Sequence, residues 1–136
     1  MSKTFTPSKR RIVVISIMLL IDSLHIIGIG GYLRGAWQNF HYSYFSDIVM
    51  PFGAYMLLCQ MEDGSHIRIP WWGKLAGAFL LPALLETLQY FGISALGSTF
   101  DPLDYVAYGI GAASAALVDT QLFPRIFVFW LGDIRE

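Results

Sequence analysis

The sequence predicts an all-α membrane protein, a four-helix transmembrane bundle with a short C-terminal helix at the membrane interface. Hydrophobic residues make up 55% of the 136 residues and charged residues only 14%, with a mean hydropathy of +0.54. A soluble domain carries roughly 25% charged residues, so this chain has too little charge to cover a water-facing surface. The alternative is an unusually apolar soluble bundle. The length is that of one domain, residues 1–136.

Four apolar segments provide the second observation, because each is close to the roughly 20 residues that a helix needs to cross a bilayer. The first segment follows basic residues, as a signal peptide does, but it contains Asp22 and His25 and no small-residue cleavage site follows. We therefore expect it to be a retained helix. The expected spans are about 12–33, 44–62, 72–93 and 103–121.

A fifth apolar patch, Leu122–Leu131, is too short to span a bilayer. Pro124 and Arg125 interrupt it, and the ring of Trp130 suits an interfacial position. We expect this patch to form a short helix that lies on the membrane surface.

Lysine and arginine collect on one side of the expected bundle. The N-terminal segment, the second loop with the start of the third span, and the C-terminal tail hold eight of the nine, and Arg34 in the first loop is the ninth. Cytoplasmic loops carry the excess of these residues, so both termini are expected in the cytoplasm. The net charge of −1 gives no general attraction to nucleic acid. Cys59 is the single cysteine, which excludes an internal disulfide and a cysteine metal site.

Glu86 lies in the apolar third span, with Gln89 three residues further on the same helix face. Pro82, one turn earlier, frees the backbone carbonyl of Ala78. A carboxyl group inside a membrane span is costly and usually has a partner and a purpose. We expect a polar pocket at this point. The alternative is a protonated Glu86 that forms a structural hydrogen bond between helices.

Three aspartates stand where spans are expected to begin. Asp101 is a good N-cap, and Pro102 suits the first helical position. Asp104, at the third position, is placed either to favour the helix dipole or to point into the bundle. Asp47 is expected to open the second span and to serve its N-terminus, with Pro51 adding a kink one turn later.

Asp22 and His25 share one face of the first span, 10 and 13 residues beyond Ile12. Pairing an aspartate with a histidine lessens the cost of burying either one. We expect an internal structural pair, or alternatively groups that handle a proton or a ligand. His41 and His66 are expected in solvated loops.

The orientation gathers these groups at one end of the bundle. The first span runs outward, so Asp22 and His25 lie at or beyond the midplane, and Glu86 lies roughly 10 Å before the outer end of the third span. Asp47, Asp101 and Asp104 stand at the outer surface. These positions predict an acidic, partly buried cleft that opens on the extracytoplasmic side.

The pattern resembles the VanZ-like family of small bacterial membrane proteins over about residues 44–120. The matching residues are Glu86-x-x-Gln89 in an apolar helix, then Asp101 and Asp104 opening a glycine-containing last helix, with Asp47 in an earlier helix. The chain departs from that family in three places. Tyr108 replaces a common asparagine, Pro51 replaces a frequent histidine, and the loop Ala95–Thr99 lacks the usual arginine.

The resemblance implies a bacterial cell-envelope protein of the cytoplasmic membrane, with a family association with teicoplanin resistance. On this basis we expect a site that binds a polar ligand, such as a lipid head group, a cell-wall precursor or a glycopeptide. Paired acids are also suited to a divalent cation, but we expect no metal and no cofactor. The binding residues that we expect are Glu86, Gln89, Asp104, Asp47, Asp101, Asp22 and His25.

Two other functions remain open at the level of sequence. A structural or assembly subunit, as a homo-oligomer or with another membrane protein, needs no pocket, because the acids then serve as helix caps and interhelical contacts. A small proton-coupled transporter fits acids in apolar helices, but four helices without an internal repeat make a complete alternating-access transporter a poor fit. Motifs for hydrolytic, metal-dependent or nucleotide-dependent catalysis are missing, which disfavours an enzyme.

Overall fold

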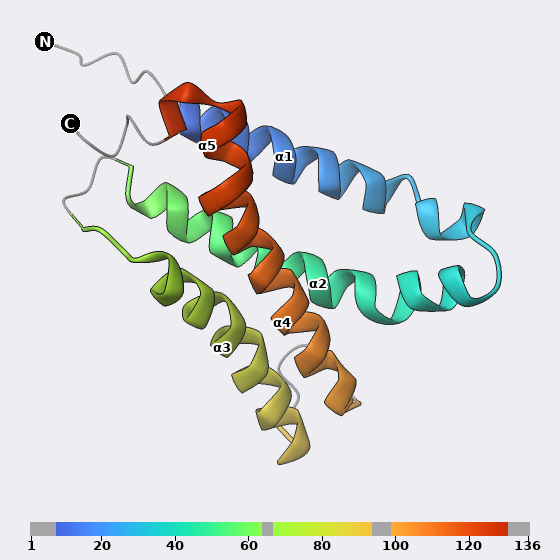
Figure 1. Cartoon of the computed structure of the whole chain (residues 1–136). Coiled ribbons are helices and arrows are strands. Elements are labelled where there is room, and N and C mark those ends of the chain that lie inside the picture. The colour runs from blue at the N-terminus through green and yellow to red at the C-terminus, as the bar shows by residue number, and fades with distance from the viewer. Residues whose placement is uncertain (1–7, 64–66, 94–98, 131–136) are drawn as a thin grey trace, which may run out of the picture.

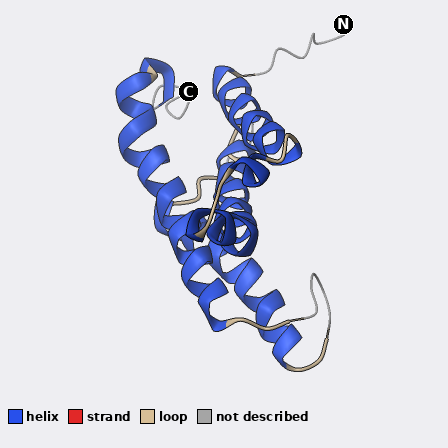
Figure 2. Cartoon of the chain, turned by 90° about the vertical axis from the view of Figure 1, so that its right-hand side faces the viewer, coloured by secondary structure: helices blue, strands red, loops and turns tan. Residues whose placement is uncertain are grey.

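The computed structural model describes residues 8–63, 67–93 and 99–130. These residues form helices joined by short connections and contain no strand, which confirms the predicted all-α fold (Figure 2). Four long helices make up most of the structure (Figure 1). They are α1 (Lys9–Ile26), α2 (Ala36–Met61), α3 (Trp71–Tyr90) and α4 (Pro102–Leu117), with the short elements η1 (Ile29–Tyr32), η2 (Val118–Leu122), α5 (Phe123–Ile126) and η3 (Val128–Trp130).

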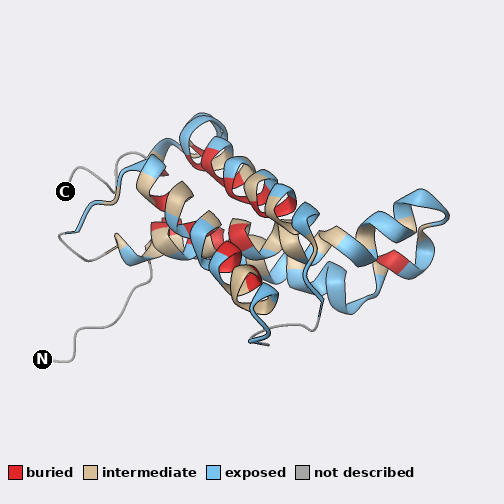
Figure 3. Cartoon of the chain, turned by 90° about the horizontal axis from the view of Figure 1, so that it is seen from below, coloured by how far each residue is buried: buried red, intermediate tan, exposed pale blue. Residues whose placement is uncertain are grey.

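The core forms where α4 crosses α2 and packs beside α3 (Figure 1). Small residues on one face of α4 allow this close approach. Ala112 and Ala115 have no exposed surface, and a Cβ atom added at Gly111 would lie 2.1 Å from the carbonyl oxygen of Ile48. The backbones of α2 and α4 therefore touch at Gly111, and the buried residues line the facing sides of the helices (Figure 3).

Helix α2 begins at Ala36, eight residues before the expected start at 44, so the prediction that Asp47 opens this helix is wrong. Gly35 precedes the helix with φ +63°, a backbone conformation that favours glycine and ends the preceding segment. Asp47 lies well inside the helix. His41, expected in a loop, is also helical, whereas His66 lies outside the described residues.

Helix α4 does not end where a separate surface helix was expected. Its backbone continues through η2, a π-helical turn, directly into α5. The wider turn comes immediately before α5, where Pro124 has no N–H to donate to a carbonyl one turn earlier. Trp130, expected at the membrane interface, is fully buried against Phe123. The fifth apolar patch therefore folds back onto the bundle.

Large apolar side chains are exposed on all four long helices. Leu20, Leu57, Leu80 and Leu117 are each between 57% and 62% exposed. By length and composition, one run among the described residues, Pro102–Ile126, is sufficiently long and apolar to cross a membrane, a test that a buried helix of a soluble protein also passes. In the rest of the described chain, charged and polar residues interrupt the helices.

Candidate functional site

An acidic cavity of about 350 Å³ lies between α2, α3 and α4. Three carboxyl groups line it, one from each helix: Asp47 from α2, Glu86 from α3 and Asp104 from α4. Gln89 and Tyr108 add an amide and a phenol. Four of the seven residues expected to bind a ligand therefore line one cavity, although they come from three helices.

Glu86 is 4% exposed and is held by hydrogen bonds to both of its oxygens. Oε1 accepts from the backbone N–H of Asp101 at 3.0 Å, and Oε2 accepts from the hydroxyl of Tyr108 at 3.3 Å. These bonds fix the carboxyl group at the wall of the cavity. They also tie the end of α3 to the start of α4.

Asp101 and Asp104, close neighbours in sequence, have different roles. Asp101 is the N-cap of α4, and its Oδ1 accepts from the N–H of Leu103 at 2.9 Å, with Pro102 in the first turn as expected. The side chain of Asp104 instead lines the acidic cavity together with that of Asp47.

The carboxyl groups surround the cavity rather than meet at one point. Within the described residues, no group of three or more acidic, histidine or cysteine side chains is close enough to hold a metal ion. No lysine or arginine in the described part of the chain lines this cavity. The cavity therefore presents negative charge and hydrogen-bond acceptors, which favour a cationic group or a hydrogen-bond donor.

Asp22 and His25 line a second hollow of about 200 Å³ between α1 and α2. Ser46 and Met50 line both this hollow and the acidic cavity, so the two adjoin. Within the described residues, Asp22 and His25 make neither an ion pair nor a hydrogen bond with each other. His25 is exposed and stacks on the ring of Phe45, with 6.1 Å between ring centroids.

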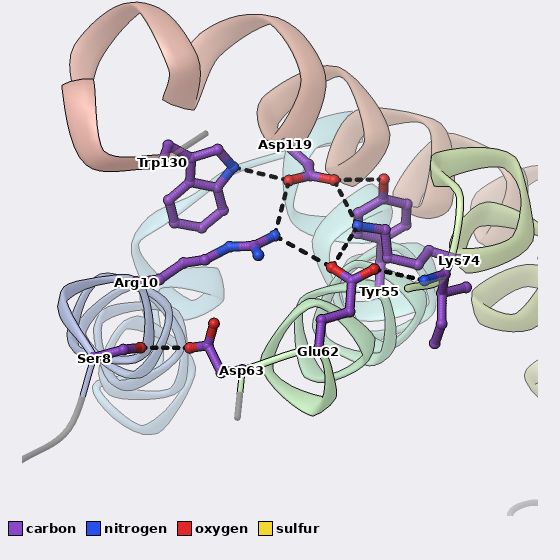
Figure 4. Close-up of polar contacts among 9 residues, drawn as sticks. Ser8, Arg10, Tyr55, Glu62, Asp63, Lys74, Asp119 and Trp130 are labelled. Carbon is purple, nitrogen blue, oxygen red and sulfur yellow. Dashed lines mark hydrogen bonds and ion pairs between the residues drawn. The ribbon is translucent and has the colours of Figure 1, made fainter. Parts of the chain in front are cut away.

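A second polar cluster, which the sequence did not lead us to expect, lies at the opposite ends of the same helices. Figure 4 shows its side chains. It contains two cations and two carboxylates with little exposed surface. Lys74 Nζ lies 3.2 Å from Glu62 Oε2 and 3.1 Å from Asp119 Oδ2. Arg10 Nη2 lies 3.5 Å from Glu62 Oε2 and 3.7 Å from Asp119 Oδ1. We call Arg10, Glu62, Lys74 and Asp119 the charge cluster.

Asp119 is the centre of the charge cluster. Besides the two cations, it accepts a hydrogen bond from the hydroxyl of Tyr55 and one from the indole N–H of Trp130, each at 2.9 Å. The π-helical turn that contains Asp119 places its side chain among α1, α2, α3 and η3 (Figure 4). Each carboxylate faces two cations. The two positive and two negative charges sum to zero, and the attraction between them partly offsets the cost of burying them.

The signal for the charge cluster was present in the sequence. Lys74 and Asp119 are each an isolated charge in an apolar segment, and the predicted topology places both at the inner end of the bundle with Arg10 and Glu62. In this fold the helix ends bring the opposite charges together, and the four side chains retain little exposed surface.

Apolar packing separates the two polar regions. Pro51, Pro82, Ala78 and Ala112 are buried between them. Along α4, Asp104 and Asp119 are fifteen residues apart, roughly 22 Å at 1.5 Å per residue. Neither region extends through this layer in the described residues.

Comparison of the chain with protein-family models, curated proteins and solved structures gave no match.

Proposed function

We propose that this chain is an integral membrane protein with four spans and both termini in the cytoplasm. The exposed leucine side chains on all four long helices support this, because large apolar side chains on the outside of a bundle suit lipid better than water. The excess of lysine and arginine at one end of the helices supports the orientation. On that orientation the charge cluster is cytoplasmic and the acidic cavity opens outward.

We further propose that the acidic cavity binds a polar ligand at the outer leaflet: a lipid head group, a cell-wall precursor or a glycopeptide. One observation carries this proposal, which is that Asp47, Glu86 and Asp104 from three helices line a single cavity without a cationic side chain. A positively charged amine is the ligand group that such a wall favours, because hydrogen bonds between an ammonium group and a carboxylate are charge-assisted.

The likeness to the VanZ-like family supports a bacterial cytoplasmic membrane and a link to glycopeptide resistance as part of the same proposal. Glu86-x-x-Gln89 and Asp104, which carry that likeness, are residues of the cavity wall. The chain departs from the family pattern at Pro51 and Tyr108, and each of these residues has a defined contact in this fold. Tyr108 donates a hydrogen bond to Glu86, and Pro51 is buried against α4.

Ligand binding is tested with purified protein in lipid nanodiscs and n-butylammonium as the simplest amine probe. Asp104→Asn is expected to weaken binding at least about tenfold, since a hydrogen bond to a charged group contributes about 1.5–3 kcal/mol. Asp63→Asn, near the charge cluster, is the matched control and should bind as the unsubstituted protein does. Equal binding by the Asp104 and Asp63 variants, or no binding by the unsubstituted protein, would refute an amine-binding cavity.

Topology is tested separately by labelling single cysteines with a membrane-impermeant maleimide in intact cells. Cys59 is fully buried and is first replaced by alanine. Ile93 and Arg68, both exposed, lie at opposite ends of α3. Cysteine at position 93 should be labelled from outside and cysteine at position 68 only after cell lysis. The reverse pattern would overturn the proposed orientation.

A structural or assembly role is the alternative that a specific observation favours. Both oxygens of Glu86 are already used by hydrogen bonds within the protein, as expected for an interhelical contact. Glu86→Gln distinguishes the two roles, because it preserves the shape of the side chain and removes its charge. Unchanged glycopeptide susceptibility in a bacterial host, with the folded protein still present, would favour the structural role.

A transporter role receives less support. The buried apolar layer around Pro51, Pro82 and Ala112 separates the acidic cavity from the charge cluster. A proton that moved between the two polar regions would have to cross this layer, where the described residues provide no polar side chain to relay it. The proposal therefore places binding, rather than transport, at the acidic cavity.

A further inference from the structure

An apolar groove of about 200 Å³ runs along the outside of the α2–α4 pair. Tyr44 and Ile48 of α2 line one wall, and Leu103, Val106 and Ala107 of α4 line the other. The lining is almost entirely apolar. The groove is open, and Leu103 and Val106 are 56% and 57% exposed.

The groove and the acidic cavity are formed by adjoining faces of the same two helices. Ile48, Leu103 and Ala107 of the groove directly follow or precede Asp47, Asp104 and Tyr108 of the cavity, respectively. Consecutive helical residues point about 100° apart, since one turn contains 3.6 residues. A molecule that extends around the α2–α4 seam therefore contacts carboxyl groups on one side and apolar side chains on the other.

Tyr44 marks the junction of the two hollows. Its ring lines the groove, and its hydroxyl lies within electrostatic reach of Asp101, Asp104 and Asp47. The polar end of the groove is thus directed toward negative charge. At its other end, the direct contact of Gly111 with Ile48 brings the two helices together.

We propose that the occupant of the groove is the alkyl chain of a membrane amphiphile whose primary ammonium group lies in the acidic cavity. This inference rests on the proposed function and specifies the ligand as an amine-bearing lipid. Charge complementarity identifies the head group, because three carboxyl groups and no lysine or arginine line the cavity within the described residues. An anionic head group would meet repulsion there. The exposed apolar lining of the groove indicates that the rest of the ligand is an alkyl chain.

The proposal is tested with n-butylammonium and n-dodecylammonium, which have the same head group and differ in chain length. Binding to the protein in nanodiscs is measured against empty nanodiscs, so that partition into lipid is subtracted. Because removal from water contributes about 0.8 kcal/mol per methylene, the longer probe should bind at least about tenfold more tightly when its affinity is referred to its free aqueous concentration. 1-Dodecanol, which has the tail without the charge, should bind more weakly than n-dodecylammonium.

Val106→Trp fills the groove at an exposed position, and Leu84→Trp makes a comparable change at a 58% exposed position on α3, outside the groove. We expect Val106→Trp to remove the gain from chain length without weakening n-butylammonium binding, and Leu84→Trp to leave both unchanged. Helical circular dichroism verifies that each variant folds.

The outcomes separate the two levels of the proposal. If n-butylammonium binds but n-dodecylammonium gains nothing, or if Val106→Trp leaves that gain intact, the groove does not hold the chain and only the amine-binding cavity survives. If neither amine binds, the proposed function itself fails. Preference for an anionic or quaternary ammonium amphiphile of equal chain length would overturn the assignment of a primary ammonium head group.

Discussion

Trp130 donates its indole N–H to Oδ1 of Asp119 at 2.9 Å, with both side chains buried. The two residues come from η3 and η2, so this bond fastens the C-terminal turn to the end of the α4 helical run. The indole ring also lies 4.7 Å from the guanidinium carbon of Arg10. One tryptophan therefore joins the C-terminal turn to both the charge cluster and α1.

Trp130→Phe tests this link, because it retains most of the ring and removes the N–H donor. Asp119 then loses one hydrogen bond in a buried site, which should lower the free energy of unfolding by about 1–3 kcal/mol. Trp72→Phe makes the same change at a position that is 62% exposed and should have little effect. Thermal unfolding in detergent measures both, and equal stability of the two variants would argue against the link.

Lys74 is expected to be essential to the charge cluster. Lys74→Met leaves Arg10 as the cation of the charge cluster that faces Glu62 and Asp119, at the longer distances of 3.5 and 3.7 Å. Removing one partner of a buried ion pair costs about 3–5 kcal/mol. Arg68→Met removes a cation from an exposed position and serves as the control, with an expected change within about 0.5 kcal/mol.

The pairing itself is tested by adding Glu62→Gln to Lys74→Met. The double variant again has balanced charge, with Arg10 facing Asp119, so its loss of stability should be smaller than the sum of the two single losses. Residues that share one network typically show such non-additive effects. Strict additivity would mean that Lys74 and Glu62 act independently.

Gly111 should be far less tolerant of substitution than Gly109, although the two lie on the same helix. Alanine at 111 places a Cβ atom 2.1 Å from a backbone carbonyl of α2, so the helices must separate, at a cost of about 1–3 kcal/mol. At Gly109 the nearest atom, on Phe79, is 4.0 Å away, and alanine there should be neutral or stabilise the helix by up to about 1 kcal/mol. Chemical unfolding measures both, and equal tolerance would contradict direct contact of α2 and α4.

Tyr108→Phe should destabilise the wall of the acidic cavity. Oε2 of Glu86 loses the hydroxyl donor of Tyr108 in a nearly buried position, and the expected cost is about 1–3 kcal/mol. Tyr90→Phe, at a 66% exposed position on α3, is the matched control. Thermal unfolding measures the difference. A Tyr108 variant as stable as the control would mean that Glu86 does not depend on this bond.

The sequence by itself determined the helical class and the identity of several local signals. Apolar segments separated by proline, glycine and charged residues predicted four long helices, and the run Asp101-Pro102 predicted the start of α4 to the residue. These features depend on local backbone preferences and on capping by a neighbouring side chain. The chemistry of Glu86 and Asp104, as acids in apolar surroundings, was also apparent without a structure.

Only the tertiary structure decided which charges meet. Asp47 lies in the interior of α2 rather than at its start, and its side chain lines the same cavity as that of Asp104. The buried cluster of Lys74 and Asp119 depends on how four helix ends converge. Such contacts join residues distant in sequence, and a shift of one residue turns a helical side chain by about 100°. Sequence periodicity alone therefore places a charge on a helix, whereas packing decides its partner.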